Sequence, residues 1–344
     1  MFVQVRCASV TQRLPPAYDA VTIAQSRKCL PGWDNLHVGE KNGGVMQEHA
    51  QGMQHAPWAQ RDMDLATARQ MNELNARFYR DNAASFSKTR QSGWPGWERC
   101  LAEARTAGGS VAAASAGNAS TSATRVLDLA CGNLRFARYL ADACSGPVSY
   151  LGIDNCPELG AGVSPTDFPS GWQLRTARLD VVGALLSGTL ASQLDAALTR
   201  AWGTAGAGPA AANLSVVFGF LHHVPTFAAR LELLRALLAA TAPGGTCCVS
   251  FWRFMSNEHL AAKAHATTER GLRELGLAPG DLGHDDYLLG WQDVPGSYRY
   301  CHHFCEREVD ALLAGLGDQA QPVARFTADG RSGDLNAYVV LRRL

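Results

Sequence analysis

Three aspartates are the residues of this sequence best placed to bind a ligand. Each of them lies at or near the end of a short apolar run. Asp128 lies in VLDLACGN, Asp154 ends YLGID, and Asp180 lies in RLDV. A carboxylate at the end of a buried strand can accept hydrogen bonds from sugar hydroxyl or amino groups. Such an aspartate is also a common helix N-cap, but acids at three successive strand ends indicate a binding site.

Gly132 turns the chain after Asp128 and restricts which ligand fits. A dinucleotide-binding turn needs three glycines, whose positions here hold Ala130, Gly132 and Arg135, and no G-K-[ST] follows as in a phosphate-binding loop. This leaves a ligand with an amino-acid end and a nucleoside end but no phosphates, namely S-adenosylmethionine. Asp128 can face its ammonium group, while Gly132 lets the backbone approach its methionine part.

The two later acids fit the nucleoside end of the same cofactor. Asp154 can accept both ribose hydroxyls, and Asp180 can accept the adenine amino group while Val181 packs against the ring. Ala130 and Asn155, which adjoin these positions, complete the cofactor residues that we expect from the strand ends.

Composition excludes several classes of protein. The 344 residues are 47% apolar and 18% charged, enough to bury a core, and 31 Lys and Arg balance 31 Asp and Glu, so no global positive field attracts nucleic acid. The ten cysteines form no CxxC pair, so we expect reduced thiols and no metal site. No signal peptide or long apolar run is present, which favours a cytoplasmic protein without a membrane partner.

The chain reads as one domain with additions. Residues 1–62 lack periodicity and are expected to be disordered or to lie outside the core, which leaves 63–344 as the working domain. The small-residue tracts at 104–124 and 203–213 read as low-complexity surface insertions, because they cannot bury enough apolar area to order themselves.

Between these tracts, strand-like and helix-like segments alternate, which is typical of an α/β fold with a parallel sheet buried on both faces. The C-terminal residues 323–344 read as an antiparallel hairpin that closes the sheet. Strands are predicted at 124–130, 148–155, 172–181, 214–220 and 246–252, and helices at 134–144, 227–241, 257–276 and 306–317.

The motifs LDLACGN, LGID, LDV, VFGFLHHVPT and APGGTCCVSFW together resemble the series found in class I S-adenosylmethionine-dependent methyltransferases. The flanking NARFYRDNAASFSKTRQSGWPGW, DYLLGWQ, YRYCHHF and NAYVVLRR are similar to the tRNA methyltransferases that esterify a carboxymethyl group on wobble uridine, and to their bacterial relatives. The resemblance runs from about Met63 to the end of the chain. It implies a Rossmann-like, mostly parallel seven-stranded sheet and S-adenosyl-L-methionine as cofactor.

Carried over by position, the resemblance adds residues around the cofactor's methionine end. Phe218 would lie beside the cofactor acids, while Tyr79, Thr89 and Arg90 would close over the methionine, with Arg90 pairing with its carboxylate. Trp94 and Pro95 match the family's aromatic-Pro step, although ordinary packing explains Trp94 and Trp97 as well.

On the substrate side, His222 and His223 match the family's His-His, and Arg299, Tyr300 and His302 match its Arg-Tyr-x-His element. If the methyl acceptor is a carboxylate, it needs no base, and Arg299 and His302 would hold it. If the acceptor is a hydroxyl or amine, His222 or His223 can act as the base. Each of the paired histidines can equally be a satisfied core residue.

Two departures keep other functions open. Ala130 and Leu134 stand where the family usually has glycines, so the loop is bulkier. The balanced charge also fits poorly with an RNA-modifying enzyme, whose phosphate contacts usually bring a basic excess. Three functions are therefore considered: a methyltransferase for a modified tRNA base, one for a small metabolite, and an inactive cofactor-binding regulator. The resemblance also implies a small activating protein partner. The polar helix at 256–276 is expected to cover the pocket.

Overall fold

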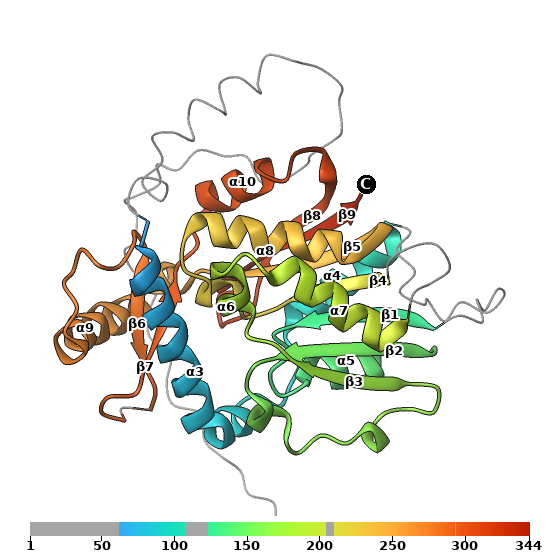
Figure 1. The fold of residues 1–344 in the computed structure, drawn as a ribbon, viewed down its shortest axis with the longest axis horizontal. Helices are drawn as coiled ribbons and strands as arrows, with labels where there is room; N and C mark the ends of the chain where they lie inside the picture. Colours follow the sequence, from blue (N-terminus) through green and yellow to red (C-terminus); the bar gives the residue numbers. More distant parts are fainter. Residues whose placement is uncertain (1–61, 108–122, 204–209, 293) are drawn as a thin grey trace, which may run out of the picture. The chain divides into compact units, whose positions relative to one another are not determined.

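The computed structural model describes residues 62–107, 123–203, 210–292 and 294–344. A seven-stranded sheet in the order β3-β2-β1-β4-β5-β9-β8 forms its centre (Figure 1). The predicted α/β class, the mostly parallel sheet and the closing C-terminal hairpin are all confirmed.

The first five strands are parallel, and β9 runs antiparallel to both β5 and β8. Thr241 pairs with Ala212 and Thr246 with Leu214, so residues 242–245 bulge out within β5, which begins before the predicted strand 246–252. The strands are β1 Thr124–Leu129, β2 Val148–Asp154, β3 Gln173–Arg178, β4 Ala212–Val217, β5 Thr241–Trp252, β8 Ala320–Ala328 and β9 Asn336–Arg343.

Alternating side chains build a core on each face of the sheet. Val126 faces one core and Leu127 faces the other, because successive residues of a strand point to opposite faces. The face with Val126 is covered by α4 Pro95–Thr106 and α5 Arg135–Ala143. The other face is covered by α6 Val181–Leu186, α7 Leu190–Trp202, α8 Phe227–Ala239 and α10 Glu306–Ala314.

A second, two-stranded sheet, which the sequence patterns did not predict, lies beside the long helix α3 Leu65–Lys88. It pairs β6 Asp286–Gly290 with β7 Tyr298–His302 in antiparallel register (Figure 1). The helix predicted at 256–276 is α9 Glu258–Leu275, but it packs on β6 and does not line the cavity described below. Short 3-10 helices are η1 Pro157–Gly160, η2 Pro165–Asp167, η3 Leu221–His223, η4 Phe254–Ser256 and η5 Gly317–Gln319.

The expectations for residues 1–61, and for most of the two insertions, fall outside the described residues. Within the described part, α4 continues to Thr106 and β1 begins at Thr124, so the first insertion is shorter than predicted. None of the described helices is long and apolar enough to cross a membrane.

Candidate functional site

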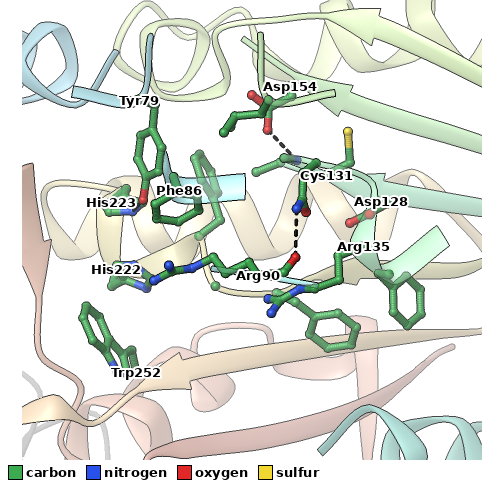
Figure 2. Close-up of a pocket in the computed structure, with 18 of the residues that line it drawn as sticks. Tyr79, Phe86, Arg90, Asp128, Cys131, Arg135, Asp154, His222, His223 and Trp252 are labelled. Atoms are coloured by element: carbon green, nitrogen blue, oxygen red, sulfur yellow. Dashed lines mark hydrogen bonds between the residues drawn. The ribbon is translucent and has the colours of Figure 1, made fainter. Parts of the chain in front are cut away.

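A cavity of about 670 Å³ opens at the carboxyl ends of β1, β2 and β4, where parallel sheets usually bind their ligands. One end is walled by the turns after these strands and the other by α3, β7 and the end of β5. Figure 2 shows the two ends, with Asp128 and Asp154 on one side and His222, His223 and Trp252 on the other.

The turn after β1 is built on left-handed backbone. Ala130 has φ 61°, Gly132 has φ 53° and Leu134 has φ 57°, a conformation that only glycine adopts without strain. The Gly132 amide donates to Asp154 Oδ2 at 2.8 Å (Figure 2). The Cys156 amide donates to Oδ1 at 2.8 Å. Burial raises the pKa of Asp154 above its usual 3.8, although these amide hydrogen bonds oppose the shift. Asp154 therefore lines the cavity with both side-chain oxygens held in a fixed orientation.

Asp128 sits deeper, with only 3% of its surface exposed. The Tyr150 hydroxyl donates a short hydrogen bond to it, and burial raises its pKa to about 7. Asp128 lines the cavity, so contact with a ligand's ammonium group stays a prediction.

Asp180 lines the cavity but already has two partners. Its carboxylate accepts from the Gly183 amide at 2.9 Å, which caps α6, and from Asn72 Nδ2 at 2.8 Å. The N-cap interpretation is therefore confirmed, while a hydrogen bond to adenine stays a prediction. Val181 is buried beside it and also lines the cavity.

His223 is held on both sides at the far end of the cavity. Its Nδ1 lies 2.8 Å from the Tyr300 carbonyl oxygen, and its Nε2 lies 2.7 Å from the Tyr79 hydroxyl. Burial, helped by the charge of Arg299, lowers the pKa of His223 to about 3. Both nitrogens are committed and the ring is neutral, which argues against the predicted role as a general base.

His222 lies between His223, at 4.1 Å between ring centroids, and Trp252, at 4.8 Å, and both ring pairs are tilted by 57°. Its Nδ1 is buried and has no hydrogen-bond partner among the described residues. Burial lowers the pKa of His222 well below 6.5, with the neighbouring His223 as the next cause. His222 is thus a neutral imidazole at physiological pH.

Two arginines bring positive charge to this end. Arg299 is 7% exposed, and its guanidinium carbon lies 5.2 Å from the Phe78 ring centre and 5.8 Å from that of Trp252. Arg90 lies 3.8 Å over Phe86, and burial followed by repulsion from Arg299 lowers its pKa to about 10. Among the ion pairs of the described chain, none involves either arginine.

His302 does not lie at the mouth of the cavity, where the resemblance would place it. It is 1% exposed, with Nδ1 2.7 Å from Asp286 and Nε2 2.7 Å from Glu308, and Glu308 also pairs with Arg230 at 2.9 Å. The Tyr300 hydroxyl donates to Asp286 at 2.7 Å in the same cluster. Residues 299 and 302 lie three apart on β7, and strand alternation turns them to opposite faces.

The remaining predicted residues lie in the core beside the cavity or in the cavity wall. Phe218 is buried, stacks on Trp97 at 5.6 Å and still lines the cavity. Trp97 is a core residue, as the packing interpretation has it, whereas Trp94 is half-buried at the cavity wall. Three further predicted residues line the cavity, namely Thr89, Pro95 and Asn155.

A face of α3 supplies cavity residues that motif reasoning missed, beside the predicted Tyr79. Asn72, Asn75 and Ala76 recur with Tyr79 at spacings of three, one and three, which places them on one side of the helix. That helical spacing was visible in the sequence. The charged Arg135 was also missed; its guanidinium lies over Trp94 at 4.7 Å.

His222, His223 and Cys301 place possible metal-binding atoms within 4.8 Å of one another. His223 already uses both nitrogens, and burial raises the pKa of the Cys301 thiol to about 12. With Arg299 nearby, this group suits a neutral, hydrogen-bonded wall better than a cation site.

Comparisons with known proteins give solved structures of similar fold. No family model and no curated protein matches the sequence. A methyltransferase from Methanosarcina mazei is 14% identical over 64% of this chain and 93% of its own, with a TM-score of 0.45. A DhpI complex described as containing SAM and HEP is 16% identical over 79% and 97%, with a TM-score of 0.45. Magnesium protoporphyrin IX methyltransferase from Synechocystis, with bound SAH, is 14% identical over 78% and 99%, with a TM-score of 0.41.

The activity of this chain therefore has to be inferred from its own cavity. None of these neighbours bears on the predicted likeness to wobble-uridine enzymes, which stays a prediction.

Proposed function

We propose that this chain is an S-adenosylmethionine-dependent methyltransferase whose acceptor is a carboxylate. The cofactor would lie along the strand ends, with its ribose on Asp154, its ammonium group towards Asp128 and its adenine against Val181. The methyl group would then point to the end of the cavity that contains Tyr79 and Arg299.

The burial of Arg299 is the observation that supports a carboxylate as the methyl acceptor. A charged arginine that is 7% exposed and has no carboxylate partner among the described ion pairs is costly, unless a ligand supplies the negative charge. Its planar donors match a carboxylate in bidentate geometry. Anion binding would offset the repulsion from Arg90.

The weak basicity of the two histidines at this end supports the same acceptor. Burial lowers the pKa of both His222 and His223, so each ring holds a proton poorly at neutral pH, and His223 already uses both nitrogens. A hydroxyl or amine acceptor would need a base, whereas a carboxylate is already ionised and nucleophilic. The protein then has to align the reactants and exclude water.

The first acceptor to test is the carboxymethyl group of a tRNA wobble uridine, as the sequence resemblance implies. A small carboxylic acid is the second candidate, favoured by the balance of 31 basic and 31 acidic residues, since tRNA binding usually brings a basic excess. The predicted inactive regulator would bind the cofactor without transferring its methyl group.

Radiolabelled S-adenosylmethionine added with the protein to a total cell extract distinguishes these functions. Label in RNA that nuclease and mild base both release establishes a tRNA ester, and label confined to small molecules supports the metabolite. Asp154→Ala is the control that should lose both signals. Cofactor binding without label in either fraction contradicts the proposed activity. Comparing purified protein with extract tests the small activating partner.

A further inference from the structure

Asn75 fixes the backbone of Tyr300 from the side. The Tyr300 amide donates to Asn75 Oδ1 at 2.7 Å, and Asn75 Nδ2 donates to the Tyr300 carbonyl at 3.2 Å. Because a backbone amide can only donate, the side-chain oxygen of Asn75 must face it. The orientation of the Asn75 amide is therefore determined.

This arrangement also determines the tautomer of His223. The Tyr300 carbonyl oxygen, 2.8 Å from Nδ1, can only accept, so Nδ1 carries the proton. Asn75 Nδ2 lies farther from Nδ1, at 3.2 Å, and has the carbonyl as its own acceptor. The ring is neutral, so Nε2 presents a lone pair.

The lone pair on Nε2 in turn fixes the Tyr79 hydroxyl. Its oxygen lies 2.7 Å from Nε2 and must donate its proton there. Burial raises the pKa of Tyr79 to about 12, so it stays a phenol. The ring is held edge-on by Phe86 at 5.0 Å and His223 at 5.3 Å between centroids. Tyr79 therefore offers the cavity oxygen lone pairs and no proton (Figure 2).

We propose that the Tyr79 oxygen accepts the polarised C–H groups of the cofactor's sulfonium methyl, and that His223 is a positioning residue that keeps this oxygen an acceptor. This inference rests on the proposed function. Tyr79 lines the same cavity as Asp154 and Arg299, and its ring lies against His223 at the acceptor end. Weak C–H···O contacts can hold a methyl group in line for attack.

Tyr79 neither gives nor takes a proton during methyl transfer. An oxygen lone pair of the acceptor carboxylate forms the new C–O bond as the C–S bond breaks. The sulfur leaves with the bonding pair as a neutral thioether, and the ester is neutral. An O–H group of Tyr79 that pointed at the sulfonium would bring a positive dipole towards it, and His223 prevents this by accepting the hydrogen bond from that O–H group.

Calorimetric binding of S-adenosylmethionine and S-adenosylhomocysteine tests this role without any acceptor, because the second ligand lacks the methyl group. We expect Tyr79→Phe to weaken the affinity for S-adenosylmethionine by about 3- to 10-fold and to leave the affinity for S-adenosylhomocysteine unchanged. Tyr139→Phe, which removes a hydroxyl outside the cavity, should change neither. An equal loss for both ligands, or no loss, overturns the inference. Wild-type protein that binds neither ligand instead overturns the proposed function itself.

Nitrogen-15 NMR of the histidine rings tests the relay directly, with His223→Gln used to assign the signal. We expect Nδ1 to be protonated and Nε2 bare between about pH 5 and pH 8. A proton on Nε2 overturns the relay. His223→Gln can still accept from Tyr79 and should keep most of the preference for the methylated ligand, whereas His223→Phe should lose it as Tyr79→Phe does.

Discussion

The backbone amide of Gly132 and the carboxylate of Asp154 are joined by a 2.8 Å hydrogen bond that ties the turn after β1 to the end of β2. The turn is strained, because the residues at 130 and 134 are left-handed without being glycine. The hydrogen bond helps to hold this backbone, which glycine would adopt without the same cost.

Ala130→Gly should therefore stabilise the protein. A residue with a Cβ atom pays about 1–2 kcal/mol for left-handed backbone, and glycine removes this strain. Glycine also gives the unfolded chain more freedom, which destabilises the folded state by about 0.5–1 kcal/mol. We expect the free energy of unfolding in urea to rise by about 0.5–1 kcal/mol. Ala141→Gly, in the helical α5 and similarly half-buried, should lower it by about 1 kcal/mol. Losses of equal size in both variants would contradict strain at residue 130.

Protonation of Asp128 should control cofactor affinity. Its pKa of about 7 means that the carboxylate that would attract an ammonium group is present above that pH and lost below it. Affinity for S-adenosylmethionine should therefore fall up to about 10-fold per pH unit below neutrality. Asp128→Asn should bind weakly with little pH dependence. Parallel pH slopes for the two proteins, measured by calorimetry, would show that another group is responsible.

Arg299→Met should separate function from stability. Removing a buried guanidinium without a carboxylate partner relieves a desolvation cost, so the free energy of unfolding should stay the same or rise. Methyl transfer should fall at least about 10-fold through a higher KM for the acceptor, with cofactor affinity unchanged. Arg299→Lys should recover little, because it lacks the planar donors. Arg273→Met, on the exposed face of α9, is the control. A loss of cofactor binding in Arg299→Met would contradict the assignment of Arg299 to the acceptor.

The sequence predicted most of the fold and the cofactor end because both depend on local signals. Short apolar runs separated by helices predict a parallel sheet, and the ends of parallel strands meet at one edge, so Asp128, Asp154 and Asp180 could be placed before the structure. The acceptor end depends on how α3 packs on the unpredicted β6-β7 hairpin, which periodicity did not reveal. Strand alternation would have separated Arg299 from His302, but the family motif grouped them.

The buried cluster around His302 should make stability depend on pH. Burial and Arg230 lower the pKa of His302, but Glu308 and Asp286 outweigh them and raise it above 6.5. The stabilisation is therefore complete below about pH 6.5 and lost as the pH rises through the raised value. The pKa of Glu308 is lowered, mainly by Arg230 and His302 against the effect of burial, so its contribution is instead lost in acid.

His302→Asn should lower the free energy of unfolding by about 3–5 kcal/mol near neutral pH, because Asp286 loses its cationic partner and keeps neutral donors such as the Tyr300 hydroxyl, while Glu308 keeps Arg230. It should also abolish the decline in stability that the wild type shows above about pH 6.5. His303→Asn is the matched control: burial lowers the pKa of His303 to about 4, so this variant should keep that decline. Urea unfolding followed across the pH range checks both. The same alkaline decline in His302→Asn as in the wild type would mean that His302 is not the group that loses the proton.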